Sequence, residues 1–115
     1  MPSAPLDDAS LPPSRKMLRL TVIVKAKDSY NGKTFTDILL SLYKGAGISG
    51  ATVTHAARGY GVRGSARADV LGLSINLPTI IETVADREKV AKVLPEIHGM
   101  IGSNGLITTE EVDVY

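Results

Sequence analysis

The chain of 115 residues contains no cysteine and no tryptophan, and it has a single phenylalanine. The absence of cysteine excludes disulfide bonds, thiolate metal sites and a cysteine nucleophile. The expected strands lack the aromatic platform that sheet-type RNA-binding modules use. The net charge of +1 gives no overall electrostatic reason to expect a nucleic acid or a membrane surface as a partner. We therefore expect no nucleic acid partner.

Long hydrophobic runs are also missing, because no apolar stretch approaches the roughly 18–20 residues of a membrane span. The first 16 residues contain four prolines together with Asp7 and Asp8, and they lack the apolar core of a signal peptide. We expect residues 1–16 to form a disordered N-terminal extension. Residues 17–115 are then expected to form one cytoplasmic domain without membrane insertion.

Hydrophobic periodicity predicts six regular elements in the order strand, helix, strand, strand, helix, strand. The expected ranges are a strand over 17–26, a helix over 33–46, strands over 51–58 and 77–85, a helix after Asp86, and a strand over 106–115 that is interrupted near 109–110. Asn31 or Thr34 is expected to cap the first helix, and Gly45 and Gly47 supply its stop positions. Pro95 predicts a kink or a break in the second helix.

This order of elements is typical of an α+β, ferredoxin-like sandwich, with both helices on one face of an antiparallel sheet. The opposite face is expected to keep Ile23, Thr54, Ile81 and Thr83. Such a face is not strongly polar, so we expect something to cover it. Burial against copies of the same chain is the simplest cover, which predicts an oligomer.

The segment 58–67 is the strongest candidate for binding chemistry, because three arginines and three glycines lie within ten residues. Glycine permits close approach of the backbone to a ligand, and arginine offers forked donors to phosphate or carboxylate. The whole loop over 58–76 is also longer than a join between two strands needs. We expect it to bind an anionic ligand or a protein partner, with a solvated hairpin tip as the plain alternative. The candidate residues are Arg58, Gly59, Gly61, Arg63, Gly64 and Arg67.

A second glycine-rich segment, Gly102-Ser103-Asn104-Gly105, stands between the second helix and the last strand. It is either a ligand loop or a plain helix-to-strand turn. A third segment, Gly32-Lys33-Thr34, resembles the tail of a phosphate-binding loop, but Lys27 occupies the position where that motif needs its first glycine. We interpret the third segment as a turn followed by a helix start.

The two histidines, His55 and His98, are far apart in the sequence and have no neighbouring cluster of ligands. A metal site formed by one chain is therefore not expected. No serine stands in the setting of a nucleophile elbow, and we assign no catalytic residue.

Five runs of residues carry a specific resemblance to a known family. They are Tyr30-Asn31-Gly32-Lys33, the run Ala46-Gly47-Ile48-Ser49-Gly50-Ala51-Thr52-Val53, Arg58-Gly59-Tyr60-Gly61, Leu77-Pro78 leading into Ile80-Ile81-Glu82, and Gly105-Leu106-Ile107-Thr108. Over residues 18–114 the chain resembles the bacterial and archaeal domain-of-unknown-function family 190. That family is similar to PII signalling proteins, whose ferredoxin-like subunits form trimers.

The resemblance implies a regulatory protein that binds a ligand between subunits. By position, 58–76 corresponds to the PII loop that contacts regulated targets, and 102–105 corresponds to the glycine-rich phosphate loop, although Leu106 stands where PII proteins have a lysine. It implies a homotrimer whose intersubunit clefts take a small anion, with an adenine nucleotide as the candidate ligand. Backbone amides of 102–105 would then face phosphate, and Arg58, Arg63 or Arg67 would neutralise its charge.

Three alternatives stay open at this point. The first is an adaptor that binds no small ligand and whose 58–76 loop docks on a protein such as a transporter. An enzyme on the same fold, for instance a small phosphatase, would need an arginine and a water-orienting asparagine, for which Arg63 and Asn76 are available. The third alternative is a trimer that binds a metal ion through His55 of each chain. We expect signalling by binding rather than catalysis.

Overall fold

The computed structural model of the chain describes residues 10–61, 64–67 and 77–115, with side chains described for 10–60 and 77–115. Its elements are β1 (Arg15–Lys25), β2 (Ser29–Tyr30), β3 (Lys33–Thr34), α1 (Phe35–Gly45), β4 (Thr52–His55), β5 (Arg58–Gly61), β6 (Gly64–Arg67), β7 (Pro78–Ala85), α2 (Arg87–Ile101), the 3-10 helix η2 (Gly102–Asn104) and β8 (Leu106–Val114).

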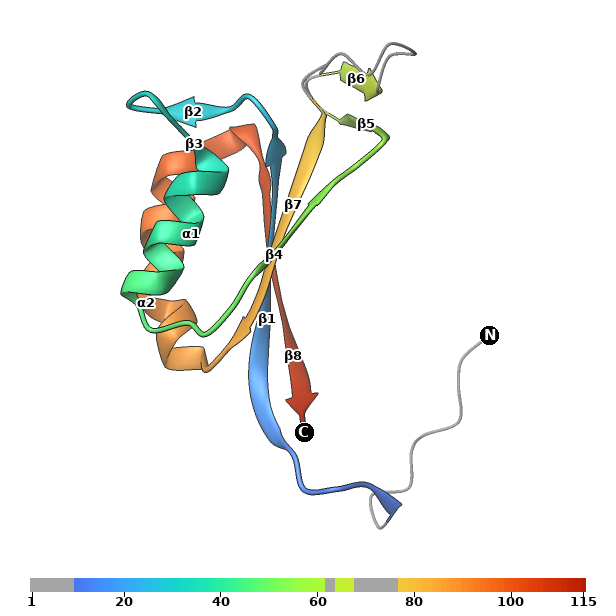
Figure 1. The fold of residues 1–115 in the computed structure, drawn as a ribbon, viewed down its shortest axis with the longest axis vertical. Helices are drawn as coiled ribbons and strands as arrows, with labels where there is room; N and C mark the ends of the chain where they lie inside the picture. Colours follow the sequence, from blue (N-terminus) through green and yellow to red (C-terminus); the bar gives the residue numbers. More distant parts are fainter. Residues whose placement is uncertain (1–9, 62–63, 68–76) are drawn as a thin grey trace.

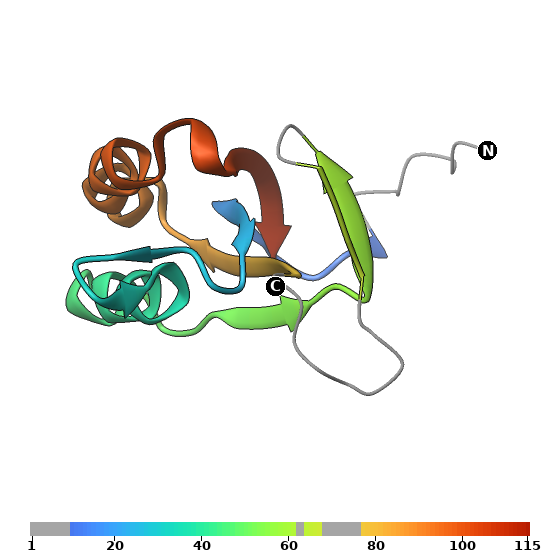
Figure 2. The same cartoon turned by 90° about the horizontal axis from the view of Figure 1, so that it is seen from above.

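Four strands form one antiparallel sheet in the order β4-β7-β1-β8 (Figure 1). Helices α1 and α2 lie side by side against one face of this sheet, and the other face is open (Figure 2). The helices follow β1 and β7 and act as crossovers. This is the α+β, ferredoxin-like fold that the order of elements predicts.

Helix α1 begins where its capping signal predicts. The Oγ1 of Thr34 accepts a hydrogen bond from the amide of Asp37 at 3.2 Å, so Thr34 rather than Asn31 caps the helix. Phe35, Leu39 and Tyr43, which are spaced four residues apart along the helix, are buried in the core.

The end of α1 is fixed by a glycine cap and by a lysine from α2. Gly47 adopts a φ of 77°, and its amide donates to the carbonyl of Lys44 at 3.1 Å. The amide of Ile48 donates to the carbonyl of Tyr43 at 2.9 Å, and the Ile48 side chain is buried. This is the Schellman arrangement, with the hydrophobic contact that accompanies it. The Nζ of Lys89 donates to the carbonyl of Gly47 at 2.8 Å, which ties α1 to α2.

Helix α2 runs without a break through Pro95, so the break considered from the sequence does not occur. Val90, Val93, Ile97 and Ile101 face the core, whereas Pro95 is exposed. The carbonyl that loses its helical donor belongs to Ala91, which is exposed too. Because water can hydrogen-bond that carbonyl, the proline is tolerated on this side of the helix.

The register of β1 and β7 decides which side chains face the helices. Val22 pairs with Ile81 and Leu20 pairs with Thr83, and all four are buried on the helix-covered face. The expectation that Ile81 and Thr83 lie on the open face is therefore wrong. Apolar and β-branched residues occupy both faces of β7, so alternation alone does not show which set is inside.

The open face has a mostly apolar row near one end and charged residues near its middle. One row across all four strands consists of Thr54, Ile80, Ile23 and Leu106, and the last three residues form its apolar part, called the apolar row below. Further along β1, the guanidinium of Arg19 lies 3.8 Å from Glu82 and 3.1 Å from Glu110. The face thus carries an apolar row beside a compact ion-pair network.

Several boundaries differ from the sequence-based expectations. The predicted strand over 51–58 ends at His55, and Arg58 begins a separate strand, β5. Strand β8 is continuous through 109–110, because every residue from Leu106 to Val114 pairs with β1. Strand β1 begins at Arg15, two residues earlier than expected. Arg15 and Lys16, which the sequence placed in a disordered extension over residues 1–16, therefore belong to the sheet. For residues 1–9, which lie outside the described part of the chain, disorder stays a prediction.

Within the ranges that the structure describes, no helix is long and apolar enough to cross a membrane.

Candidate functional site

The arginine- and glycine-rich segment folds as a two-stranded ribbon, β5–β6. Its register pairs Arg58 with Arg67, Tyr60 with Ser65, and Gly61 with Gly64. Arg63 falls in the connection between the strands, outside the described residues. Two of the three candidate arginines are therefore directly opposite each other at the base of the hairpin. Like charges in directly opposed positions destabilise a ribbon, so this register favours an anion as a neighbour.

Gly59 holds the base of the hairpin against the main sheet. A Cβ at this position would lie 2.8 Å from the Cγ of Pro78, the first residue of β7. Only glycine therefore permits this close approach of β5 to the sheet. Packing is sufficient to explain the glycine, and a ligand contact by Gly59 stays a prediction.

The second candidate segment is a turn that closes α2 and starts β8. Gly102 has a φ of 56° and donates its amide to the carbonyl of His98, while Ser103 and Asn104 continue as η2 and are exposed. A Cβ at Gly105 would lie 2.7 Å from the carbonyl oxygen of Ile23 and 2.9 Å from the Cγ2 of Ile101. Glycine at 105 is thus required by packing, and phosphate binding by this turn stays a prediction.

The two segments lie at the same end of the sheet (Figure 1) but on opposite sides of it. The hairpin β5–β6 stands on the open side, and η2 lies between α2 and β8 on the helix side (Figure 2). The sheet itself separates them within one chain. One ligand molecule would contact both segments most simply if the hairpin belonged to one copy of the chain and the Gly102–Gly105 turn to a second copy.

The remaining sequence motifs have structural explanations. Asn31 and Gly32 adopt positive φ values of 51° and 82° and form the two-residue turn between β2 and β3, as Asn-Gly pairs do in tight hairpins. The Nδ1 of His55 lies 3.2 Å from the Oγ1 of the buried Thr79. No group of three or more histidine, cysteine, aspartate or glutamate side chains is placed to hold a metal ion within the described ranges.

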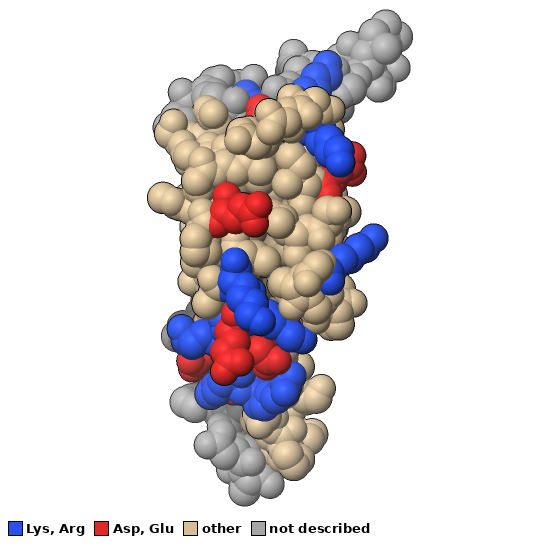
Figure 3. Space-filling model, turned by 90° about the vertical axis from the view of Figure 1, so that its left-hand side faces the viewer, with Lys and Arg blue, Asp and Glu red and all other residues tan. Residues whose placement is uncertain are grey.

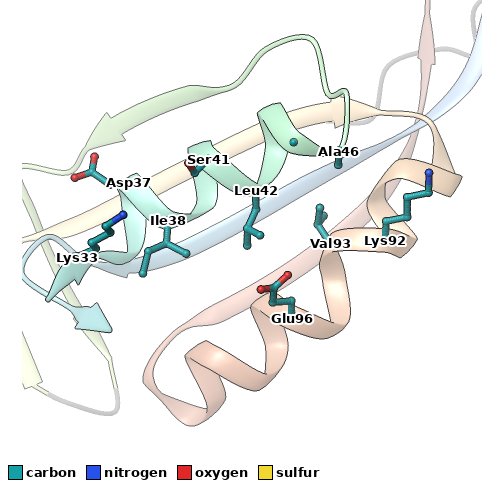
Figure 4. A pocket seen from close by; sticks show the side chains of 10 residues that line it. Lys33, Asp37, Ile38, Ser41, Leu42, Ala46, Lys92, Val93 and Glu96 are labelled. Carbon is teal, nitrogen blue, oxygen red and sulfur yellow. The ribbon is translucent and has the colours of Figure 1, made fainter. Parts of the chain in front are cut away.

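A groove between α1 and α2, which the sequence patterns did not reveal, has a volume of about 770 Å³. Ile38, Leu42 and Val93 form its apolar floor, with Lys33 near one end and Lys92 near the other (Figure 4). On this helix-covered side, charges of both signs gather in the lower half, and most of the upper half is uncharged (Figure 3). None of the residues that line the groove belongs to β5, to β6 or to the Gly102–Gly105 turn, so the groove is separate from both candidate ligand segments.

Two groups on the described chain have shifted pKa values. Burial raises the pKa of Tyr43 to about 12, and its hydroxyl has no hydrogen-bond partner among the described residues. The carboxylate of Asp113, 2.7 Å from the ammonium of Lys16, raises the pKa of that exposed lysine. Both lie away from the candidate ligand segments.

Comparison with known proteins gives both sequence relatives and structural neighbours. A UPF0166 protein of Methanocaldococcus jannaschii is 41% identical over 96 residues, covering 84% of this chain and 89% of that protein. A UPF0166 protein of Aquifex aeolicus is 39% identical over 101 residues, covering 87% and 92%.

Solved structures with the same fold are PII-like. CPII from Thiomonas intermedia K12, a nitrogen regulatory PII-like protein bound to ADP, AMP and bicarbonate, superposes with a TM-score of 0.71 at 16% identity and covers 89% of this chain and 91% of its own. A PII-like signaling protein from Thermus thermophilus gives 0.62 at 17% identity, covering 88% and 90%.

The family model of domain-of-unknown-function family 190 (DUF190), described as an uncharacterized ACR, matches residues 17–114. This match covers the whole sheet apart from the first two residues of β1, and both helices. It agrees with the resemblance inferred from the short motifs. The chain belongs to the DUF190 family and has the fold of PII-like proteins.

Proposed function

We propose that this chain is a cytoplasmic, homotrimeric PII-like regulator that binds an adenine nucleotide in clefts between its subunits. The observation that carries the proposal is the register of β5–β6, which sets Arg58 directly opposite Arg67 on the open side of the sheet. An anionic ligand supplies the negative charge that this pair of cationic positions lacks. The ADP and AMP in the structure of CPII indicate the ligand class.

The intersubunit position of the cleft follows from the two sides of the sheet. In the proposed trimer, copies of the chain cover the open face, which includes the apolar row of Ile23, Ile80 and Leu106. The hairpin of one subunit and the Gly102–Gly105 turn of another would then approach the same phosphates. Gly102, Ser103, Asn104 and Gly105 would offer backbone donors, and Arg58, Arg63 and Arg67 would supply charge.

Regulation would work through the hairpin. With nucleotide bound, the opposed arginines are neutralised, so the ribbon becomes more stable and presents one defined surface to a target. Ordering of a segment by a ligand is a common switching mode. The proposed role needs binding without turnover, so ADP incubated with the protein is expected to remain intact.

The test is thermal unfolding of the purified protein with ADP, AMP and ATP, each with and without magnesium. A ligand at about 100 times its dissociation constant adds about 2.7 kcal/mol of stability, which moves the midpoint by several degrees. Arg58→Ala and Arg67→Ala are expected to reduce the shift, whereas Lys44→Ala, which changes an exposed lysine of α1, leaves it unchanged. The absence of any shift in the unmodified chain would contradict nucleotide binding.

A second candidate function is an adaptor that binds a protein without a small ligand. The favouring observation is Tyr60 on β5, whose side chain is 91% exposed. Exposed aromatic side chains are frequent anchors of protein interfaces. A partner protein such as a transporter, captured by the wild-type chain but not by Tyr60→Ser, would favour this function if no nucleotide shifts the unfolding midpoint.

A further inference from the structure

The end of β1 contributes a lysine that no sequence motif singled out. Lys25 is the last residue of β1 and pairs with Pro78, the same proline that Gly59 packs against. Lys25 shares its face with Arg19 and Ile23, because alternate residues of a strand point to the same side. It therefore lies on the open face, at the base of the hairpin that carries Arg58 and Arg67.

A tight turn fixes the backbone at this position. The amide of Lys25 donates to the Oδ2 of Asp28 at 3.0 Å, and the amide of Asp28 donates to the carbonyl of Lys25 at 3.0 Å. Asp28 is the nearest acidic residue along the chain, and this carboxylate oxygen is engaged by the backbone. The lysine side chain thus projects from a well-defined strand end.

Among the described residues, Lys25 differs from the other basic residues of β1 in having no acidic partner. Arg15, Lys16 and Arg19 each lie within 3.3 Å of a carboxylate, whereas the ammonium of Lys25 makes no ion pair with any residue in the described ranges. The side chain is nevertheless partly buried, next to the row that contains Ile23 and Ile80. A cation on such an apolar surface interacts more strongly with an anion than one in open water.

We propose that Lys25 is a further ligand-binding residue, which together with Arg58 and Arg67 binds the terminal phosphate of a nucleoside diphosphate. The inference rests on the proposed function and adds to it a third cation from the main sheet. The two arginines belong to the hairpin, whereas Lys25 belongs to β1, a central strand of the main sheet. The phosphate therefore bridges one cation of the main sheet and two cations of the hairpin, and this bridge couples the nucleotide to the hairpin.

The experiment is calorimetric titration of ADP into the wild-type protein, Lys25→Met, Lys25→Arg and the control Lys44→Met. Loss of a charge-assisted contact is expected to weaken ADP binding by about tenfold or more in Lys25→Met. Lys25→Arg keeps the charge and is expected to retain most of the affinity, and Lys44→Met binds as the wild type does. Circular dichroism melts of each variant confirm that it is folded.

Wild-type affinity in Lys25→Met would overturn the assignment of Lys25 while leaving the proposed nucleotide function intact. If the wild type does not bind ADP, the nucleotide function fails, and inorganic pyrophosphate becomes the deciding probe for Lys25. Pyrophosphate binding that is lost in Lys25→Met supports the cation cluster. Pyrophosphate binding that is absent, or equal in both proteins, overturns it.

Discussion

Gly105 is both a candidate ligand residue and a tightly packed part of the fold. A Cβ there would lie 2.7 Å from the carbonyl oxygen of Ile23 and 3.1 Å from the Cγ1 of Val24, and neither the backbone nor a buried side chain can move away easily. We expect Gly105→Ala to lower the free energy of unfolding by about 1–3 kcal/mol, measured by urea denaturation. A loss of ligand binding in this variant is therefore not evidence of a direct contact.

The matched control is Gly99→Ala. Gly99 lies in α2 and is exposed, and no heavy atom lies within 4 Å of the position that a Cβ would take there. Alanine is preferred over glycine inside a helix by about 0.5–1 kcal/mol, so this change is expected to raise the free energy of unfolding. Equal stability of the two variants would contradict the packing explanation for Gly105.

Tyr43 places a hydroxyl in the core without a hydrogen-bond partner among the described residues. Leaving such a group unsatisfied costs about 1–3 kcal/mol, so Tyr43→Phe is expected to increase the free energy of unfolding. The measurement is urea denaturation of both proteins at pH 8. A less stable phenylalanine variant would show that the hydroxyl has a partner, for instance an ordered water.

The same side chain predicts a pH dependence. Burial raises the pKa of Tyr43 from 10.0 to about 12, so the folded chain holds this proton more tightly than the unfolded chain does. Its contribution to stability is fully present below pH 10 and is lost as the pH rises through 12. Two pKa units correspond to about 2.7 kcal/mol. The advantage of Tyr43→Phe over the wild type is therefore expected to grow between pH 8 and pH 11.

The individual elements differ in how well the sequence predicts them. Helix α1 has a capping threonine, an apolar stripe and a terminal glycine, and each of these local signals has its expected partner in the structure. The ribbon β5–β6 was not predicted as strands, because its glycines and arginines show no alternation of apolar and polar residues. Its pairing depends on backbone register and on the contact between Gly59 and Pro78, which no local pattern encodes.

The candidate site likewise has a part that the sequence predicts and a part that only the structure shows. The sequence singled out Arg58 and Arg67 by residue type, and the structure adds that they are paired across the ribbon. Lys25 was missed, because its relation to the hairpin runs through Pro78, more than 50 positions away in the sequence. Contacts of that range are set by sheet order, so only the fold brings these residues together.

Pro95 offers a test at the level of one helix. It lies on the exposed side of α2, where the backbone amide of an alanine would donate a hydrogen bond to the carbonyl of Ala91. Proline costs up to about 3 kcal/mol relative to alanine in a helix interior. We therefore expect Pro95→Ala to raise the unfolding midpoint, measured by circular dichroism. A lower midpoint would mean that the packing of α2 on the sheet depends on a bend at this residue.

For the molecule as a whole, the open face determines whether the proposed site can exist. The sheet separates the hairpin from the Gly102–Gly105 turn within one chain, so a ligand that uses both needs a second subunit. The apolar row of Ile23, Ile80 and Leu106 gives that subunit a surface to cover. Assembly and ligand binding are therefore expected to fail together when this row is disrupted.

Ile80→Lys tests this link, because it places an ammonium group in the middle of the row, on a central strand. Burying an unpaired charge costs several kcal/mol per ion, so the variant is expected to be a folded monomer in light scattering at micromolar concentration and to lose the ADP-induced shift of the unfolding midpoint. The core under the helices is untouched, because Ile81 rather than Ile80 faces it.

The control variant is Ser41→Lys on the exposed side of α1, which adds the same charge and should leave both the assembly and the ADP-induced shift unchanged. If Ile80→Lys assembles like the wild type, the open face is not the surface between subunits, and a ligand that contacts both segments must reach them by another arrangement of the chains.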